Sequence, residues 1–139
     1  MKIQEEVLDH LTEECRYIRQ TVFVDEQGFQ VEFDQLDDTA VHFLICVDGH
    51  PAATARMMTG ETGEYIIGRV AVLPQYRSDH LGSRIMQLAH REAERRGGKK
   101  TVVSAQCRVQ PFYESLGYVA SGAIYLDEFC EHIHMEKVL

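Results

Sequence analysis

Apolar residues near the start of the chain recur at helical spacing. They are separated mainly by three or four residues: Val7, Leu8, Leu11, Cys15, Ile18 and Val22. This spacing places them on one face of a helix, and the acidic Glu5, Glu6 and Asp9 lie near its positive end. We predict an amphipathic helix of about four turns, preceded by a short strand at residues 2–4.

Three runs rich in β-branched and other apolar residues follow, bounded by turn residues. We predict strands over residues 40–47, 51–59 and 65–73. Asp48-Gly49 and Thr62-Gly63-Glu64 separate them, and such short turns join antiparallel neighbours. The polar, acidic stretch 25–38 before the first strand predicts a loop or irregular helix.

The second half of the chain alternates helical and strand patterns. A helix is predicted from Leu81 to the Gly97-Gly98 pair, with Ile85, Leu88 and Ala89 on its apolar face. The remaining expected elements are a strand at 101–105, a helix at 109–116 and two strands within 118–138. A strand, a crossover helix and another strand imply a parallel pair. The fold class predicted is therefore α+β, with a mixed central sheet flanked by helices.

Composition narrows the classes of function. A chain of 139 residues suits one domain, which we expect to cover residues 1–139. Fourteen basic against 22 acidic residues disfavour a nucleic-acid partner and favour a cationic small substrate. No apolar run is long enough for a signal core or a membrane span, so no membrane partner is expected. Four scattered cysteines without a CxxC pair indicate reduced thiols in a cytoplasmic protein.

The segment 68–82 reads as a strand, a tight polar loop and a helix start. Unpaired backbone N–H groups at such a helix terminus converge on one point and favour an anion, especially a phosphate. The segment contains neither a Walker sequence nor G-x-G-x-x-G, so nothing supports a P-loop or dinucleotide site. The alternative is an ordinary strand-to-helix turn.

Two segments carry a resemblance to a known family. Gln75-Tyr76-Arg77-Ser78-Asp79-His80-Leu81-Gly82 is similar to the Q/R-x-x-G-x-G/A loop of the GNAT superfamily of N-acetyltransferases, which binds the acyl-CoA pyrophosphate. Pro111-Phe112-Tyr113-Glu114-Ser115-Leu116-Gly117-Tyr118 resembles that family's A-x-x-F-Y-x-x-L-G-F block. Val22 to Gly28 also resembles a segment of one branch of small GNAT proteins.

The loop departs from the family pattern at two positions where glycine is usual. Ser78 and His80 carry side chains there, and a β-carbon at position 80 could crowd a backbone that must approach the diphosphate. Asp79 adds a negative charge, whereas His80 could offer an N–H donor to phosphate.

The resemblance implies direct transfer of an acetyl group from acetyl-CoA to a primary amine of a small molecule or peptide. It assigns Tyr113 as the general acid for the departing CoA thiolate. The residues implied in acetyl-CoA binding are Val70, Ala71, Val72, Arg77, Ser78, Asp79, His80, Leu81, Gly82 and Gln106. It also implies a possible homodimer, because family members often pair through their sheets, and it implies no metal.

The acceptor side carries no motif, so candidates come from residue chemistry. The candidates for removing the amine proton, directly or through water, are Glu26, His42, Glu128 and His132. Glu128 is also a candidate contact to the substrate amine. Arg56 and Arg69 lie on otherwise apolar strands and could bind a substrate carboxylate in a fork, or pair with a nearby carboxylate of the protein.

Two other classes of function stay open from the sequence. Ser78, Asp79 and His80 motivate a catalytically weak CoA-binding or regulatory protein with the same fold. Cys130, His132 and His134 would share one face of a strand and motivate a structural metal module. Three ligands on adjacent positions of one strand do not easily complete a tetrahedron, so we do not expect a metal.

Overall fold

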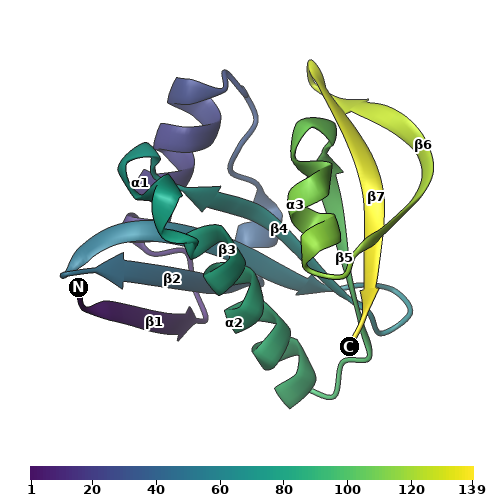
Figure 1. The fold of residues 1–139 in the computed structure, drawn as a ribbon, viewed down its shortest axis with the longest axis horizontal. Helices are drawn as coiled ribbons and strands as arrows, with labels where there is room; N and C mark the ends of the chain where they lie inside the picture. Colours follow the sequence, from purple (N-terminus) through teal and green to yellow (C-terminus); the bar gives the residue numbers. More distant parts are fainter.

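One mixed sheet of seven strands, in the order β1-β2-β3-β4-β5-β7-β6, organises the computed structural model, which describes residues 1–139 (Figure 1). The strands are β1 (Ile3–Leu8), β2 (Val41–Val47), β3 (His50–Thr59), β4 (Tyr65–Val72), β5 (Lys100–Gln106), β6 (Val119–Asp127) and β7 (Cys130–Val138). The α-helices are α1 (Glu13–Arg19), α2 (Leu81–Arg95) and α3 (Gln110–Ser115). A π-helix (Gln20–Glu26) continues α1, and 3₁₀ helices cover Gln35–Asp38, Pro74–Asp79 and Cys107–Val109.

The predicted topology is confirmed at its centre. β2, β3 and β4 form the antiparallel meander, and β4 pairs with β5 in parallel after the α2 crossover. The last two strands form an antiparallel hairpin, and β7 inserts between β5 and β6. The fold class is therefore the expected α+β arrangement of a mixed sheet with helices on its faces.

The prediction of a helix from Val7 was wrong at its start. Val7 and Leu8 belong to β1, where they pair with Phe43 and His42 of β2. The helix begins only at Glu13, because the Thr12 side chain caps it by accepting a hydrogen bond from the Cys15 N–H at 3.2 Å. Tertiary pairing with β2 thus overrides the helical spacing of the first apolar residues.

Helices cover both faces of the sheet because β2 is buried on both sides. Phe43 and Ile45 belong to the core cluster that includes α2 residues, whereas Leu44 packs with Ile18 of α1 in a second cluster. Since successive strand residues point to opposite faces, α1 and α2 lie on opposite faces of the meander. Tyr113 of α3 belongs to the first cluster, on the α2 side. No helix is long and apolar enough to cross a membrane.

Two irregularities at β4 open the centre of the sheet. β4 and β5 pair only at Tyr65–Thr101 and Ile66–Val102, and beyond this point the two strands separate. On the other edge of β4, the register with β3 shifts, so that one extra residue bulges out near Arg69. Arg69 has a φ of +52°, a left-handed conformation that a non-glycine residue adopts only under local strain.

Candidate active site

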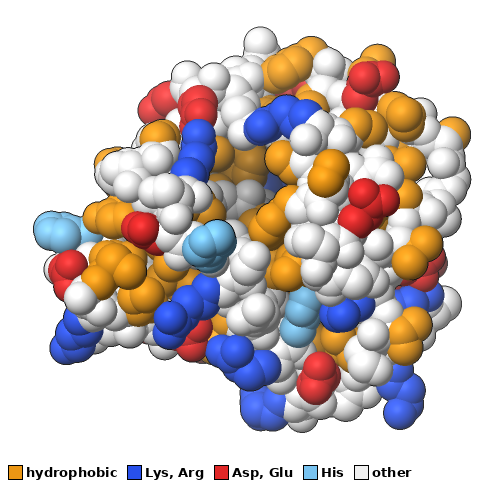
Figure 2. Space-filling model, viewed as in Figure 1, with side chains coloured by type: hydrophobic (Ala, Val, Ile, Leu, Met, Phe, Trp, Pro, Cys, Tyr) orange, Lys and Arg blue, Asp and Glu red, His pale blue; other side chains and the backbone are white.

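A cavity of about 300 Å³ opens where β4 and β5 separate. Figure 2 shows the molecule hollowed between the α1 side and the α3 side, with hydrophobic side chains in the wall of the hollow. Apolar side chains from the π-helix, the segment after it, β3 and β4 line part of it, among them Phe23, Phe29, Met58, Ile66 and Ile67. The remaining wall is polar and carries the groups capable of acid–base chemistry.

Tyr113 of α3 reaches this cavity while its ring is held in the core. Its ring packs edge-to-face against Phe112 and Tyr118, with centroid distances of 5.0 and 5.7 Å. The residue is 8% exposed. Its hydroxyl forms no hydrogen bond with the protein and is not fully buried, so it is open to the cavity. Burial raises the pKa of Tyr113 to about 12, which keeps the phenol protonated and able to donate at neutral pH.

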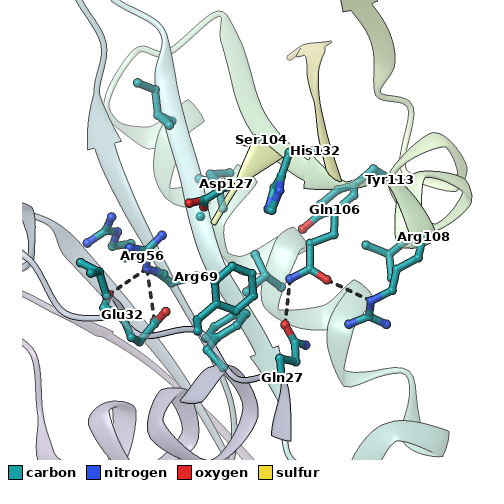
Figure 3. Close-up of a pocket in the computed structure, with 18 of the residues that line it drawn as sticks. Gln27, Glu32, Arg56, Arg69, Ser104, Gln106, Arg108, Tyr113, Asp127 and His132 are labelled. Atoms are coloured by element: carbon teal, nitrogen blue, oxygen red, sulfur yellow. Dashed lines mark hydrogen bonds and ion pairs between the residues drawn. The ribbon is translucent and has the colours of Figure 1, made fainter. Parts of the chain in front are cut away.

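His132 of β7 also lines the cavity, beside Gln106 (Figure 3). Its Nδ1 lies 3.0 Å from the carbonyl oxygen of Cys130, so Nδ1 carries the hydrogen and donates it. Nε2 is then the unprotonated nitrogen of the neutral ring. The ring stacks on Tyr125 and meets Phe29 edge-on, at centroid distances of 6.0 and 6.5 Å. These contacts fix both the ring and its tautomer, the arrangement that a general base needs.

A chain of side-chain amides crosses the cavity from the π-helix to the end of β5 (Figure 3). The Gln106 amide nitrogen donates to the Gln27 side-chain oxygen at 2.9 Å. The Gln106 oxygen accepts from Nε of Arg108 at 3.0 Å. Gln106 is a sequence candidate, whereas Gln27 and Arg108 are not. Only the fold brings Gln27 against the end of β5.

A buried group of charges, which we call the arginine–carboxylate cluster, supports one end of the cavity. Its members are Arg19, Arg56, Arg69, Glu32, Asp34 and Asp37. Arg19 is 1% exposed and binds Glu32 at 2.9 Å and Asp37 at 2.7 Å. Asp37 also binds Arg56 at 3.0 Å. Three cations and three anions balance, which is how the protein accommodates so many charges out of water.

The pKa values of two carboxyl groups in the cluster shift in opposite directions. Burial raises the pKa of Glu32, although Arg69 and Arg19 oppose this shift. Burial would also raise the pKa of Asp37, but hydrogen bonds from Arg19, from the Asp34 N–H and from Arg56 outweigh it and hold the pKa well below its ordinary value.

The two predicted substrate-binding arginines differ in how far their own carboxylates occupy them. Arg56 binds Asp34 through both terminal nitrogens, at 2.6 and 3.1 Å, and its side chain is 5% exposed. Arg69 has only Nε close to Glu32, at 3.2 Å from the carboxylate, and a 3.5 Å contact with Asp34. Its side chain is 24% exposed and lines the cavity. Of the two, Arg69 is the one still open to a ligand.

The predicted phosphate loop forms the 3₁₀ helix Pro74–Asp79, followed by His80 with φ of +59°. This left-handed conformation explains why glycine is usual at position 80 in the family that the sequence resembles. No side chain caps the start of α2, so its first N–H groups are free for an anion. A β-carbon at Gly82 would lie 3.3 Å from the Phe112 ring, so glycine there permits close packing of α2 and α3.

Arg77 of this loop turns toward the π-helix. Its terminal nitrogens bind the Glu26 carboxylate at 2.6 and 2.7 Å, and its Nε donates to the Val72 carbonyl oxygen at 3.0 Å. The hydrogen bond from Arg77 lowers the pKa of Glu26. Glu26 does not line the cavity, so we withdraw its sequence-based assignment as catalytic.

Glu128 also lies outside the cavity lining. Its carboxylate accepts from the backbone N–H groups of Gln30 and Val31 at 2.9 Å each, and these hydrogen bonds lower its pKa. We therefore correct its assignment from substrate contact to support for the segment that carries Phe29. His42 is fully buried in β2, where Nε2 contacts the Asp37 carbonyl oxygen at 3.0 Å, and it does not reach the cavity.

The terminal strand does not gather its cysteine and histidines as ligands. His134 contacts Glu136 at 3.1 Å, while His132 turns into the cavity. No group of three or more His, Cys, Asp or Glu side chains is placed to share a metal ion.

The cavity therefore brings together part of the predicted site. The sequence candidates that line it are Arg56, Arg69, Val70, Gln106, Tyr113 and His132. Ala71 is buried in the second core cluster, and Val72 and the loop from Arg77 to Gly82 lie outside the cavity lining. The sequence missed the Glu32 and Asp127 carboxylates. Only the acidic run before β2 hinted at carboxylates close to arginines.

The profile of the acetyltransferase (GNAT) domain matches residues 5–139, nearly the whole chain. The chain belongs to the GNAT acetyltransferase family. The family to which the sequence analysis pointed is thereby confirmed. The GNAT fold extends over the full sheet from β1 to β6.

Relatives of known sequence or structure agree with this assignment. The chain is 32% identical over 124 residues to YjcF of Bacillus subtilis, an uncharacterized N-acetyltransferase, and the match covers 87% of this chain and 88% of YjcF. An acyl-CoA N-acyltransferase from Pseudomonas aeruginosa superposes with a TM-score of 0.86 and 28% identity, covering 98% and 99% of the two chains. Escherichia coli ElaA superposes with a TM-score of 0.87 and 26% identity, again covering 98% and 99% of the two chains.

Proposed function

We propose that this GNAT protein transfers the acetyl group of acetyl-CoA to a primary amine of a small molecule or peptide, in the cytoplasm. The observation that carries the proposal is that Tyr113 and His132 line the same cavity. The first is a buried phenol that stays protonated, and the second is an imidazole whose Nδ1 is engaged by a carbonyl, which leaves Nε2 to accept a proton. These are the acid and the base that direct acetyl transfer requires.

Acetyl-CoA supplies the thioester, and its arm fits the opening between β4 and β5. The backbone of Val70, which faces no β5 partner, would bind the pantetheine and polarise the thioester carbonyl. The uncapped N-terminus of α2 would hold the diphosphate. Beside it, Arg84 and Arg91 share the single carboxylate of Glu5, which leaves positive charge for phosphates.

Arg77 must move for the full β4 backbone to serve this role. Its Nε occupies the Val72 carbonyl oxygen, which the family resemblance assigns to pantetheine. Both partners of the Arg77–Glu26 pair are about 40% exposed, so the pair is screened by water and weak. Release of Arg77 from Glu26 and Val72 therefore costs little free energy. This release would make the guanidinium available to bind phosphate.

The protein's own groups then move two protons. His132 Nε2 takes a proton from the amine as the nitrogen–carbon bond forms, directly or through one water. As the carbon–sulfur bond breaks, the Tyr113 hydroxyl gives its proton to the CoA sulfur. The apolar wall around Phe23 and Phe29 limits water in the cavity, which strengthens these interactions.

Acetyl-CoA is expected to stabilise the protein. At a concentration one hundredfold above its dissociation constant, a ligand that binds only the folded state adds about 2.7 kcal/mol, a shift of several degrees in Tm. Thermal melts with millimolar acetyl-CoA or CoA measure the shift in Tm, and melts with millimolar acetate are the control. An unchanged Tm would contradict acetyl-CoA binding. A shift without turnover of any amine would favour the regulatory CoA-binding alternative.

Replacing His132 with asparagine is expected to lower kcat/KM for the amine by about 10²-fold, because Nε2 no longer accepts the proton. The Kd of acetyl-CoA should stay the same, because His132 is assigned to the amine and not to CoA. Steady-state kinetics with the amine and a binding titration with acetyl-CoA test this.

The matched control is His134→Asn, two residues along the same strand. His134 faces Glu136 and does not line the cavity, so its loss should leave kcat/KM for the amine unchanged. Equal kinetics of the His132 and His134 variants would remove His132 from the mechanism.

A further inference from the structure

The free edge of the Arg69 guanidinium is the starting point. Nε binds Glu32, and Nη2 has only the 3.5 Å contact with Asp34, while Nη1 has no hydrogen bond or ion pair with the protein. Only His42 Nδ1 and Arg56 Nε are both fully buried and without a hydrogen-bond partner. Because Nη1 of Arg69 also has no partner but is not among them, it is accessible. Arg69 lines the cavity, which makes this edge a preformed anion contact inside it.

The other cavity arginines are less suited to this role. Arg56 is occupied by Asp34 and Asp37 and is nearly fully buried. Arg108 is exposed and donates to Gln106, on the same side of the cavity as Tyr113, where the CoA sulfur must lie (Figure 3). An anion on the acceptor side therefore meets Arg69.

The backbone at Arg69 supports a functional role for this side chain. Arg69 sits at the β4 bulge with φ of +52°, a conformation that glycine would adopt without strain. Strained residues of this kind persist where the surrounding structure holds them, and they are concentrated at ligand sites. Here the bulge aims a guanidinium, anchored through Glu32, along the cavity that also contains His132.

We propose that the acceptor carries a carboxylate beside its amine, as an amino acid does, and that Arg69 binds this carboxylate. The inference rests on the proposed function and specifies its substrate class. With the carboxylate on Arg69, the amine is placed toward His132 within the same cavity. Phe23, Phe29 and Met58 offer an apolar wall, so an amino acid with an apolar side chain fits best.

Matched acceptors test the proposal. The substrates are L-leucine and L-phenylalanine, their decarboxylated amines and their methyl esters, each assayed with acetyl-CoA. Wild-type kcat/KM should favour the free acids by about 10- to 100-fold, the contribution of hydrogen bonds to a charged group. In Arg69→Gln the ratio of kcat/KM for acids to that for amines should fall toward one. Arg69→Lys should recover part of this ratio, because lysine keeps the positive charge but cannot donate two parallel hydrogen bonds as a guanidinium does.

The decarboxylated amines serve as an internal control for folding of the variant, and Arg95→Gln, an exposed arginine at the end of α2, controls for loss of charge. If kcat/KM for the amines and for the acids falls equally in Arg69→Gln, Arg69 has a structural role and the proposal is overturned. Equal wild-type use of acids and amines, or a preference that survives in Arg69→Gln, would also overturn it. Transfer to no acceptor would contradict the proposed function itself, and this inference with it.

Discussion

Replacing Tyr113 with phenylalanine is expected to lower kcat by about 10²–10⁴-fold. The change removes one oxygen and leaves the ring, which keeps its contacts with Phe112 and Tyr118. The CoA thiolate would then leave without a proton donor in a cavity partly closed to water. Because burial raises the pKa of Tyr113 to about 12, the wild-type phenol remains a donor throughout the neutral range. Steady-state kinetics with saturating acetyl-CoA measure the effect.

Tyr118→Phe is the matched comparison, because it removes the hydroxyl of the neighbouring ring. The Tyr118 hydroxyl bonds His90 at 2.7 Å and Thr101 at 2.8 Å, in the core rather than in the cavity. Its loss should lower stability by about 1–3 kcal/mol, since buried polar groups lose their partner. The Tyr113 hydroxyl has no protein partner, so Tyr113→Phe should leave Tm nearly unchanged. Turnover retained by Tyr113→Phe would reduce Tyr113 to a packing residue.

The sheet could be predicted because its strands carry local signals. Residues 41–47 and 65–72 are rich in apolar and β-branched residues, and Asp48-Gly49 turns one strand into the next. Val7 and Leu8 gave no such signal, because their apolar character fits a helix as well as a strand. Only pairing with β2 decides between the two, and pairing between distant segments leaves no local trace in one sequence.

The candidate site divides in the same way. Tyr113 lies in a recognisable block, and Gln106 follows a predicted strand, so both were accessible from the sequence. Glu26 looked equally suitable as a base, yet Arg77, 51 residues away, binds it. Gln27 meets Gln106 across 79 residues. Such partners depend on tertiary folding, and so does the tautomer of His132, which Cys130 sets through a backbone carbonyl.

The arginine–carboxylate cluster leads to the second large expected effect. Asp37→Asn should lower the free energy of unfolding by about 3–5 kcal/mol, the usual effect of removing one partner from a buried ion pair. Asp37 binds both Arg19 and Arg56, which are almost completely buried, and water cannot replace it. The asparagine amide also presents N–H groups toward guanidinium N–H groups. Urea denaturation at pH 7 measures the loss.

Asp38→Asn is the control, because Asp38 is the exposed neighbour and forms no ion pair, so its effect should stay within about 0.5 kcal/mol. The effect of pH on the Asp37 variant follows from the lowered pKa of the wild-type carboxyl. A carboxyl whose pKa is lowered by folding stabilises fully above its unfolded pKa of about 3.9, and this contribution is lost as the pH falls through the folded value. The difference in unfolding free energy between wild type and Asp37→Asn should therefore be constant from pH 7 to about 5 and shrink below about 4. An Asp37 variant as stable as the Asp38 control would mean that Arg19 and Arg56 are held by Glu32 and Asp34 alone, and that the cluster does not depend on the carboxylate that bridges the two arginines.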